Sequence, residues 1–214
     1  MPLSFFAGLR SSWHGIRRKD EGPQDHEVYA FTTEPNDIVR PMGRLMEPYD
    51  IRFFEEPVIP EDRDGYRKVR AENPIPVAGG ECEFTRFGFR DFIAGGCVDI
   101  IQPDLAVCGG FSAFVQVQAM ASAYGIATVP HVWGSGIAVA AAVQAVAAIP
   151  PFPHTANPIA LLNQPVIEFD RKHNPLRDDL LEQPFSLDGG SIRVPDGPGL
   201  GVSVRDDVIS KYST

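Results

Sequence analysis

Short apolar runs that end in acidic residues set the pattern of this chain. The clearest is 51–57, which reads IRFFEEP and places Ile and Phe before two glutamates and a proline. A continuous apolar run of this kind is typical of a strand buried in a parallel sheet. Because Pro57 cannot donate a ladder hydrogen bond, the strand is predicted to end at the acids. Glu55 or Glu56 is therefore predicted to lie at the carboxyl end of a strand, where α/β folds place their chemistry.

The same pattern recurs after residue 57, in alternation with helical spacing. Four further apolar runs predict strands, at 75–78, 98–101, 126–129 and 166–169. Four amphipathic or Ala-rich stretches predict helices, at 62–73, 85–94, 112–123 and 137–149. An earlier helix is predicted to end near Glu47, with Pro41 in its first turn. Strands that alternate with helices are typical of βαβ units and a parallel sheet.

The predicted strands end in ionisable residues at a regular interval. Glu55, Glu81, Asp104 and His131 follow four successive strands, at intervals of 26, 23 and 27 residues. A unit of a TIM-type barrel has about 30 residues, but a doubly wound sheet has similar units, so the interval alone does not choose between them. Ionisable residues aimed the same way from every strand end favour the mouth of a barrel. The roughly five predicted strands would make an incomplete barrel, because a complete one has about eight.

These strand ends carry the groups needed to remove a proton beside a carboxylate. Glu55 and Glu81 can share a hard cation such as Mg²⁺, which prefers oxygen ligands. Such a cation stabilises the enolate that forms when the proton leaves. His131 titrates near neutral pH and can be the acid–base group, with Asp104 orienting its ring. Taken singly, each residue is more often a solvated or packed side chain, but four in register favour a site.

Charge and cysteine content restrict the partners. The 214 residues carry a formal net charge of −9 without a block of like charges, so nucleic acid and anionic membranes are poor partners. No stretch of the sequence is long and apolar enough to span a bilayer. Cys82, Cys97 and Cys108 are odd in number and lack metal-type spacing, which favours a reducing, cytoplasmic compartment. Cys82 is expected to pack toward the barrel wall.

Four sequence motifs together carry a family resemblance. FFEEP, AGGE, DIIQPD followed by GG, and PHVWGSGI resemble the mandelate racemase and muconate-lactonising branch of the enolase superfamily, from about residue 44 to the C-terminus. CEFTRFGFRD and PHVWGSGIA look most like acid-sugar dehydratases and galactarolactone cycloisomerases. The resemblance implies Mg²⁺ bound by Glu55 and Glu81, a dyad of His131 with Asp104, and a sugar-acid carboxylate as substrate. It also implies an acidic residue after the last strand, which is either Glu168 or Asp170.

The chain also departs from the family pattern near its N-terminus. The capping α+β domain and the first barrel strands are not recognisable, and Lys19 in RRKD does not match the Lys-x-Lys motif that supplies a second base. The third metal ligand belongs to an Asp-x-Asn motif, where this chain reads QDHEVYAFTTE. Asp25 and Glu27 lie near that position without an intact motif. The expected fold is therefore α/β, a partial (β/α) TIM-type barrel that corresponds to the C-terminal half of an enolase-superfamily barrel without its capping domain.

The motifs and the departures from them predict both the organisation and the function of the chain. We expect an irregular segment at 1–33, the partial barrel at 34–184, and a strand-and-turn extension of the same domain at 185–214. The expected function is a Mg²⁺-dependent lyase or isomerase of sugar acids, impaired by the missing parts. The alternative is an inactive barrel fragment that binds a metal or ligand, or acts as an interaction module. Open sheet edges and an apolar helix face at 137–149 predict a homo-oligomer.

Overall fold

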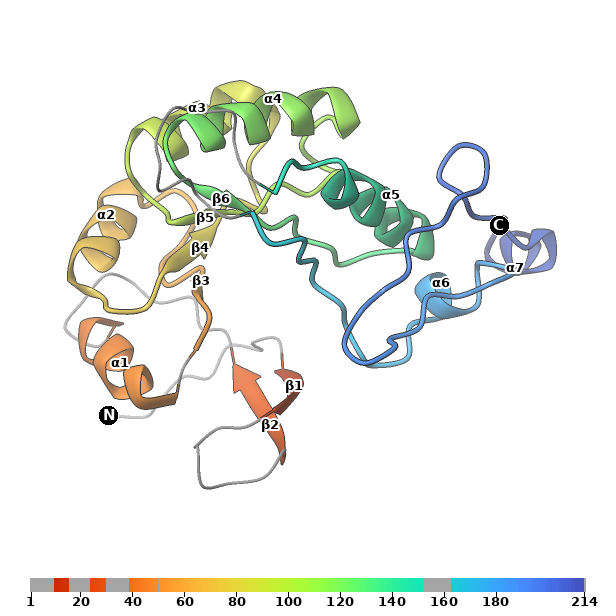
Figure 1. Cartoon of the computed structure of the whole chain (residues 1–214), viewed down its shortest axis with the longest axis horizontal. Coiled ribbons are helices and arrows are strands. Elements are labelled where there is room, and N and C mark those ends of the chain that lie inside the picture. Colours follow the sequence, from red (N-terminus) through yellow and green to blue (C-terminus); the bar gives the residue numbers. More distant parts are fainter. Residues whose placement is uncertain (1–9, 16–23, 30–38, 50, 152–162, 214) are drawn as a thin grey trace.

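Four parallel strands, each followed by a helix, form the centre of the molecule (Figure 1). The computed structural model describes residues 10–15, 24–29, 39–49, 51–151 and 163–213. The strands are β3 (Phe54–Glu55), β4 (Val77–Gly79), β5 (Ile100–Ile101) and β6 (Ala127–Thr128), hydrogen-bonded in that order. The helices that follow them are α2 (Arg63–Glu72), α3 (Thr85–Ala94), α4 (Gly110–Ala123) and α5 (Gly136–Ala147). The predicted parallel α/β arrangement is confirmed.

Capping groups and glycines determine where these helices begin. The Asp62 carboxylate accepts a hydrogen bond from the Gly65 backbone N–H at 2.8 Å and so caps α2. Before α4, Gly109 and Gly110 have φ angles of 114° and 73°, a region of backbone space that glycine enters at little cost. These two glycines turn the chain from β5 into its helix, as the sequence indicated.

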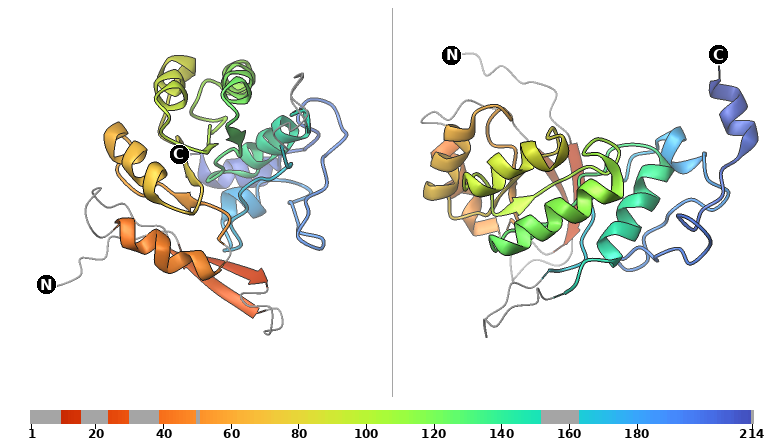
Figure 2. Two further views of the ribbon diagram at one scale, coloured as in Figure 1. Left: turned by 60° about the vertical axis from the view of Figure 1, so that its left-hand side comes forward. Right: turned by 90° about the horizontal axis from the view of Figure 1, so that it is seen from above.

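The sheet separates two apolar clusters, because side chains alternate along each strand. Phe54, Val77 and Ile101 face the helices and belong to the large core. Ala78 and Ile100 face the other way and pack in a small second cluster. Figure 2 shows the helices in an arc around the strands, so that they cover the first face alone. The second face is the one that corresponds to a barrel interior.

The segment at 1–33 differs from its prediction. It was expected to be irregular, but β1 (Arg10–Gly15) and β2 (Gln24–Tyr29) pair antiparallel over six residues each. The pairing satisfies the backbone polar groups that each strand turns toward the other, and the mixed charges of this segment did not reveal it. Next along the chain, α1 (Val39–Met46) and a short 3₁₀ turn, η1 (Glu47–Tyr49), confirm the helix predicted to end near residue 47.

The C-terminal part also differs from its prediction. Residues 166–169 are described without a strand assignment, so the predicted last strand is wrong. The extension at 185–214 has single bridges, Leu181 to Val204 and Asp188 to Ser191, in place of a strand. It ends in helix α7 (Asp206–Tyr212), and a shorter helix, α6 (Pro175–Asp178), precedes it. Two acidic residues in the first turn of α7 favour that helix, and the sequence prediction missed them.

The sequence predicted no membrane-spanning stretch. Across the described ranges, no helix is both long enough and apolar enough to cross a bilayer.

Candidate active site

Register along the strands brings the predicted residues to one end of the open face. Glu55 is in register with Ala78, and Ala78 with Ile100, so all three face away from the helix layer. Gln102 follows Ile100 by two residues, and His131 follows Val129 by two. Because the side-chain period of an extended chain is two, these residues continue onto the same face. The contacts described below confirm that the strand ends converge.

His131 is held between two carboxylates. Its Nδ1 lies 2.8 Å from Asp104 Oδ2, and its Nε2 lies 3.4 Å from Glu81 Oε2. Burial lowers the pKa of His131, but the hydrogen bond to Asp104 and the charges of Glu168, Glu81 and Asp104 outweigh it and raise the pKa to about 9. At neutral pH the ring is therefore an imidazolium, with Nδ1 fixed by Asp104 and Nε2 able to transfer a proton.

Glu168, rather than Asp170, joins this group of side chains. Its Oε1 accepts a hydrogen bond from Gln102 Nε2 at 2.7 Å, and its Oε2 accepts one from the Val132 backbone N–H at 3.3 Å. Burial, the charge of Glu55 and a hydrogen bond with Glu55 raise the pKa of Glu168 to about 8. Asp170 instead pairs with the buried Arg177, at 3.2 Å. These contacts place Glu168 in the site and pair Asp170 with Arg177, a choice that the sequence left open.

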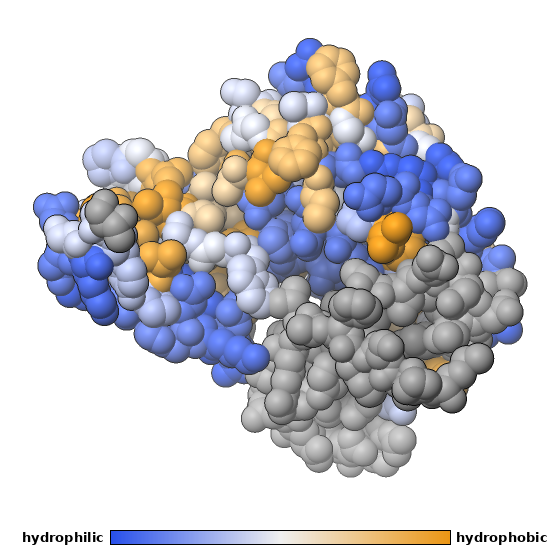
Figure 3. Space-filling view, turned by 180° about the vertical axis from the view of Figure 1, so that it is seen from behind, coloured by the Kyte–Doolittle hydropathy of each residue, from blue (hydrophilic) through white to orange (hydrophobic). Residues whose placement is uncertain are grey.

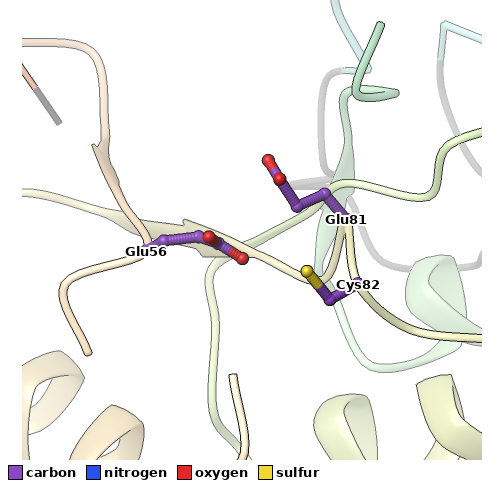
Figure 4. Close-up of side chains that lie close together, drawn as sticks. All are labelled: Glu56, Glu81 and Cys82. Carbon is purple, nitrogen blue, oxygen red and sulfur yellow. The ribbon is translucent and has the colours of Figure 1, made fainter. Parts of the chain in front are cut away.

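Glu56, Glu81 and Cys82 form a second grouping at the same edge (Figure 4). One ligand atom from each lies within 4.8 Å of the other two. Burial, followed by the charges of Glu81 and Glu55, raises the pKa of Glu56 to about 7. Glu56 Oε1 is buried and has no hydrogen-bond partner. Cys82 is exposed, so the expectation that it packs against the barrel wall is wrong.

The sequence left Glu56 as an alternative to Glu55 at the strand end and then gave the metal-binding role to Glu55 alone, and it gave Gln102 no role. Glu56 has a φ of 40°, which breaks the strict alternation and brings its side chain to the same edge as Glu81. No sequence signal indicates that backbone angle. For Gln102 a signal existed, since it stands two residues before Asp104 and so shares its face.

The carboxylates suit a hard divalent cation. Glu56 and Glu81 place carboxylate oxygens within 4.8 Å of each other, and Glu55 and Glu168 share the Gln102 amide nitrogen. The pKa values of Glu56, Glu81 and Glu168 are raised, first by burial and then in part by neighbouring carboxylates. An excess of half-buried negative charge and a buried, unpaired oxygen of Glu56 fit Mg²⁺, which takes oxygen ligands. The exposed Cys82 thiol is a poor ligand for Mg²⁺, because this cation prefers oxygen to sulfur.

Asp25 and Glu27 lie on β2, away from the parallel ladder. β2 is hydrogen-bonded to β1 in a separate two-stranded sheet. The structure therefore gives no strand pairing that would place either residue next to Glu55. The identity of a third carboxylate ligand stays a prediction.

Comparisons with known proteins give the family. A model described as Enolase C-terminal domain-like matches residues 32–208. A D-galactarolactone cycloisomerase of Agrobacterium fabrum is 46% identical over 171 residues, covering 80% of this chain and 44% of the relative. An arabinonate dehydratase of Saccharolobus solfataricus is 34% identical over 171 residues, covering 80% and 42%. The chain thus spans less than half the length of these relatives.

Solved structures agree with this assignment. The crystal structure of a 3,6-anhydro-D-galactonate cycloisomerase from Zobellia galactanivorans matches with a TM-score of 0.71 and 40% identity, over 81% of this chain and 46% of that one. A protein described as a putative mandelate racemase from Bordetella bronchiseptica matches with a TM-score of 0.73 and 30% identity, over 83% and 44%. The partial barrel and the family resemblance are both confirmed: the chain belongs to the enolase C-terminal domain-like family, among the mandelate racemase and acid-sugar dehydratase proteins.

Proposed function

We propose that this protein is a magnesium-dependent lyase or isomerase that removes the proton beside the carboxylate of a sugar acid. The observation that carries the proposal is the 2.8 Å contact between His131 Nδ1 and Asp104 Oδ2, set among half-buried carboxylates at the strand ends. The names of the two relatives, a galactarolactone cycloisomerase and an arabinonate dehydratase, support a sugar acid as the substrate class. Dehydration and cycloisomerisation both begin with this proton transfer.

Each residue has a defined part in the proposal. Asp104 holds His131 Nδ1, so Nε2 is the atom that gives or takes the proton. Glu55 and Glu81 would hold the cation, and Glu168 would lie beside them. When bound, Mg²⁺ supplies positive charge that offsets negative charge developing on the substrate carboxylate. Proton removal uses the neutral ring, and because the pKa of His131 is raised to about 9, the neutral fraction grows as the pH rises toward that value.

The alternative function is binding of a metal or ligand without turnover. The positions of the lysines favour this alternative for the 214-residue chain. The lysines within the described ranges are Lys68 on α2, Lys172 before α6 and Lys211 on α7. In that part of the chain, no hydrogen bond or ion pair joins a lysine to His131 or to the site carboxylates. A reaction that needs a second base on the other side of the substrate therefore has none here. We propose that the 214-residue chain supports slow proton exchange at most.

Deuterium exchange tests both statements. The purified chain is incubated in D₂O with Mg²⁺ and galactarate- or gluconate-type acids, and the α-proton signal is followed by NMR. We expect slow exchange that falls by about 10²-fold or more in His131→Asn, since a positioned acid–base group contributes about 10²–10⁴-fold. The matched control is His173→Asn, because His173 is exposed and faces Asp179 at 3.4 Å outside the site.

Two outcomes would contradict the proposal. Exchange that is unaffected by His131→Asn would remove the dyad from the mechanism. Robust dehydration or lactone cycloisomerisation by the isolated chain would show that its activity is not impaired.

A further inference from the structure

A single amide nitrogen donates to two neighbouring carboxylates of the candidate site. Gln102 is completely buried, and its Nε2 donates to Glu168 Oε1 at 2.7 Å and to Glu55 Oε1. The two acceptors come from parts of the chain that are far apart, Glu55 from β3 and Glu168 from the segment before α6. The amide nitrogen of one side chain therefore links two acids that are far apart in the sequence.

The other half of the same amide has no partner. Gln102 Oε1 is buried and accepts no hydrogen bond. An unpaired buried acceptor costs about 1–3 kcal/mol, and native proteins carry few of them. A side chain selected for packing alone would be apolar at this position, because an apolar group of the same shape leaves nothing unpaired. The two carboxylates thus orient the amide, and in this orientation the amide oxygen has no hydrogen-bond partner.

Position and length make glutamine suited to this contact. Gln102 lies two residues before Asp104 on an extended segment, so the end of β5 supports His131 through one residue and the carboxylates through the other. Glutamate at this position would add a third negative charge between two others. Asparagine is one methylene shorter and would not reach both acids from the same backbone.

The geometry points to Gln102 as the positioning residue of this site, which holds Glu55 in the orientation for binding the cation and keeps Glu168 beside it. Residues that hydrogen-bond to metal ligands orient them, and their loss typically lowers metal affinity about 10- to 100-fold. The inference rests on the proposed function insofar as Glu55 binds Mg²⁺. The hydrogen-bonded bridge from Gln102 to the two acids does not require a metal.

Calorimetric titration of the 214-residue chain with Mg²⁺ at pH 8 tests the effect on the cation. Gln102→Met removes both donors and nearly keeps the volume, and we expect its Kd to rise about 10- to 100-fold. The matched control is Gln144→Met. Gln144 Nε2 also donates to two oxygens, the carbonyls of Pro195 at 2.7 Å and Leu200 at 3.3 Å, away from the site. Gln144→Met should leave the Kd within about twofold. An unchanged Kd in folded Gln102→Met would overturn the inference.

A measurement on the unaltered chain does not depend on metal binding or on the folding of a variant. The side-chain amide protons of Gln102 are observed by ¹H–¹⁵N NMR without Mg²⁺. We expect both to resonate downfield of those of the exposed Gln183 and to exchange slowly with water, since each donates to a carboxylate. Glu168→Gln should move these resonances upfield. Shifts and exchange like those of Gln183 would overturn the bridge, whereas absent Mg²⁺ binding with a confirmed bridge would count against the proposed function alone.

Discussion

At the scale of single residues, half-buried carboxylates of the site stabilise the folded state more when they are protonated than when they are ionised. The pKa of Glu56 is raised to about 7 and that of Glu168 to about 8, first by burial and then by neighbouring carboxylates. The folded state thus binds protons more tightly than the unfolded state, whose glutamates titrate near 4.3. The stability from these two groups is present at low pH and is lost as pH rises from about 4.5 through 7 and 8.

The pH dependence of melting should therefore depend on Mg²⁺. At pH 8 the carboxylates are ionised and repel one another, so Mg²⁺ should raise the melting temperature by about 4–8 °C, a gain of roughly 2 kcal/mol. At pH 5 protons occupy the same oxygens, and the rise should be about 1 °C. Differential scanning fluorimetry with and without Mg²⁺ at both pH values measures this difference.

Charge-neutral variants provide the controls for that measurement. Glu81→Gln removes a proposed ligand and should abolish most of the rise at pH 8. Glu182→Gln changes an exposed residue of the C-terminal segment and should leave the rise intact. An equal effect of Mg²⁺ at pH 5 and pH 8 would mean that the cation does not compete with protons for these carboxylates.

At the scale of elements, Gly80 links strand β4 to Glu81, a proposed ligand of the cation. Its φ is 114°, and a Cβ built there would lie 2.9 Å from Ile101 Cδ1 in the core behind the sheet. A side chain at this position therefore meets both backbone strain and crowding. The chain can deliver Glu81 to the end of β4 because this position carries no side chain.

Gly80→Ala should destabilise the fold and displace Glu81. We expect a loss of about 1–2 kcal/mol from the backbone conformation and about 1–3 kcal/mol more from crowding against Ile101. Gly125→Ala is the matched control, because Gly125 has a φ of 70° and no atom within 4 Å of the added Cβ. Urea unfolding of both variants separates the two costs. Equal losses of stability in the two variants would show that Ile101 moves away from the added Cβ at no cost.

At the scale of the whole molecule, exposed apolar side chains concentrate on α3, α4 and the residues beside them. Phe84 and Phe87 are 63% and 57% exposed, and Phe111 and Val115 are 43% and 60% exposed. The predicted apolar surface at 137–149 is mostly covered, since seven of the twelve residues of α5 are buried. Seen from behind, the molecule has apolar patches separated by hydrophilic side chains (Figure 3).

We predict that the chain associates with itself through the exposed face of α3 and α4. Exposed apolar patches of this kind favour association, and the outer strands β3 and β6 of the four-stranded sheet offer further pairing. Light scattering over a concentration series should show oligomers, and Phe87→Ser should shift them toward monomer. Ile209→Ser on α7, which changes an exposed apolar residue elsewhere, is the control. A single monomeric species at all concentrations would refute this prediction.

Local chain chemistry was sufficient for the sheet, its helices and the dyad. Apolar runs that stop at Glu55, Glu81, Asp104 and His131 mark strand ends, and parallel strands of similar length bring such ends to one edge. The helices between them begin and end close to the predicted residues, because caps, glycines and prolines act within a few residues of the chain. The contact between Asp104 and His131 follows from their places on neighbouring strands.

Long-range packing was needed for the rest of the site. Glu168 and Asp170 are two residues apart, and their separation into a site residue and an ion-pair partner depends on Gln102 and Arg177, which approach from elsewhere in the chain. The φ of Glu56 and the exposure of Cys82 likewise depend on how neighbouring strand ends pack. Residues 166–169 have the apolar composition of a strand but do not form one. A strand requires a neighbouring strand to which it is hydrogen-bonded, and composition alone does not supply that neighbour.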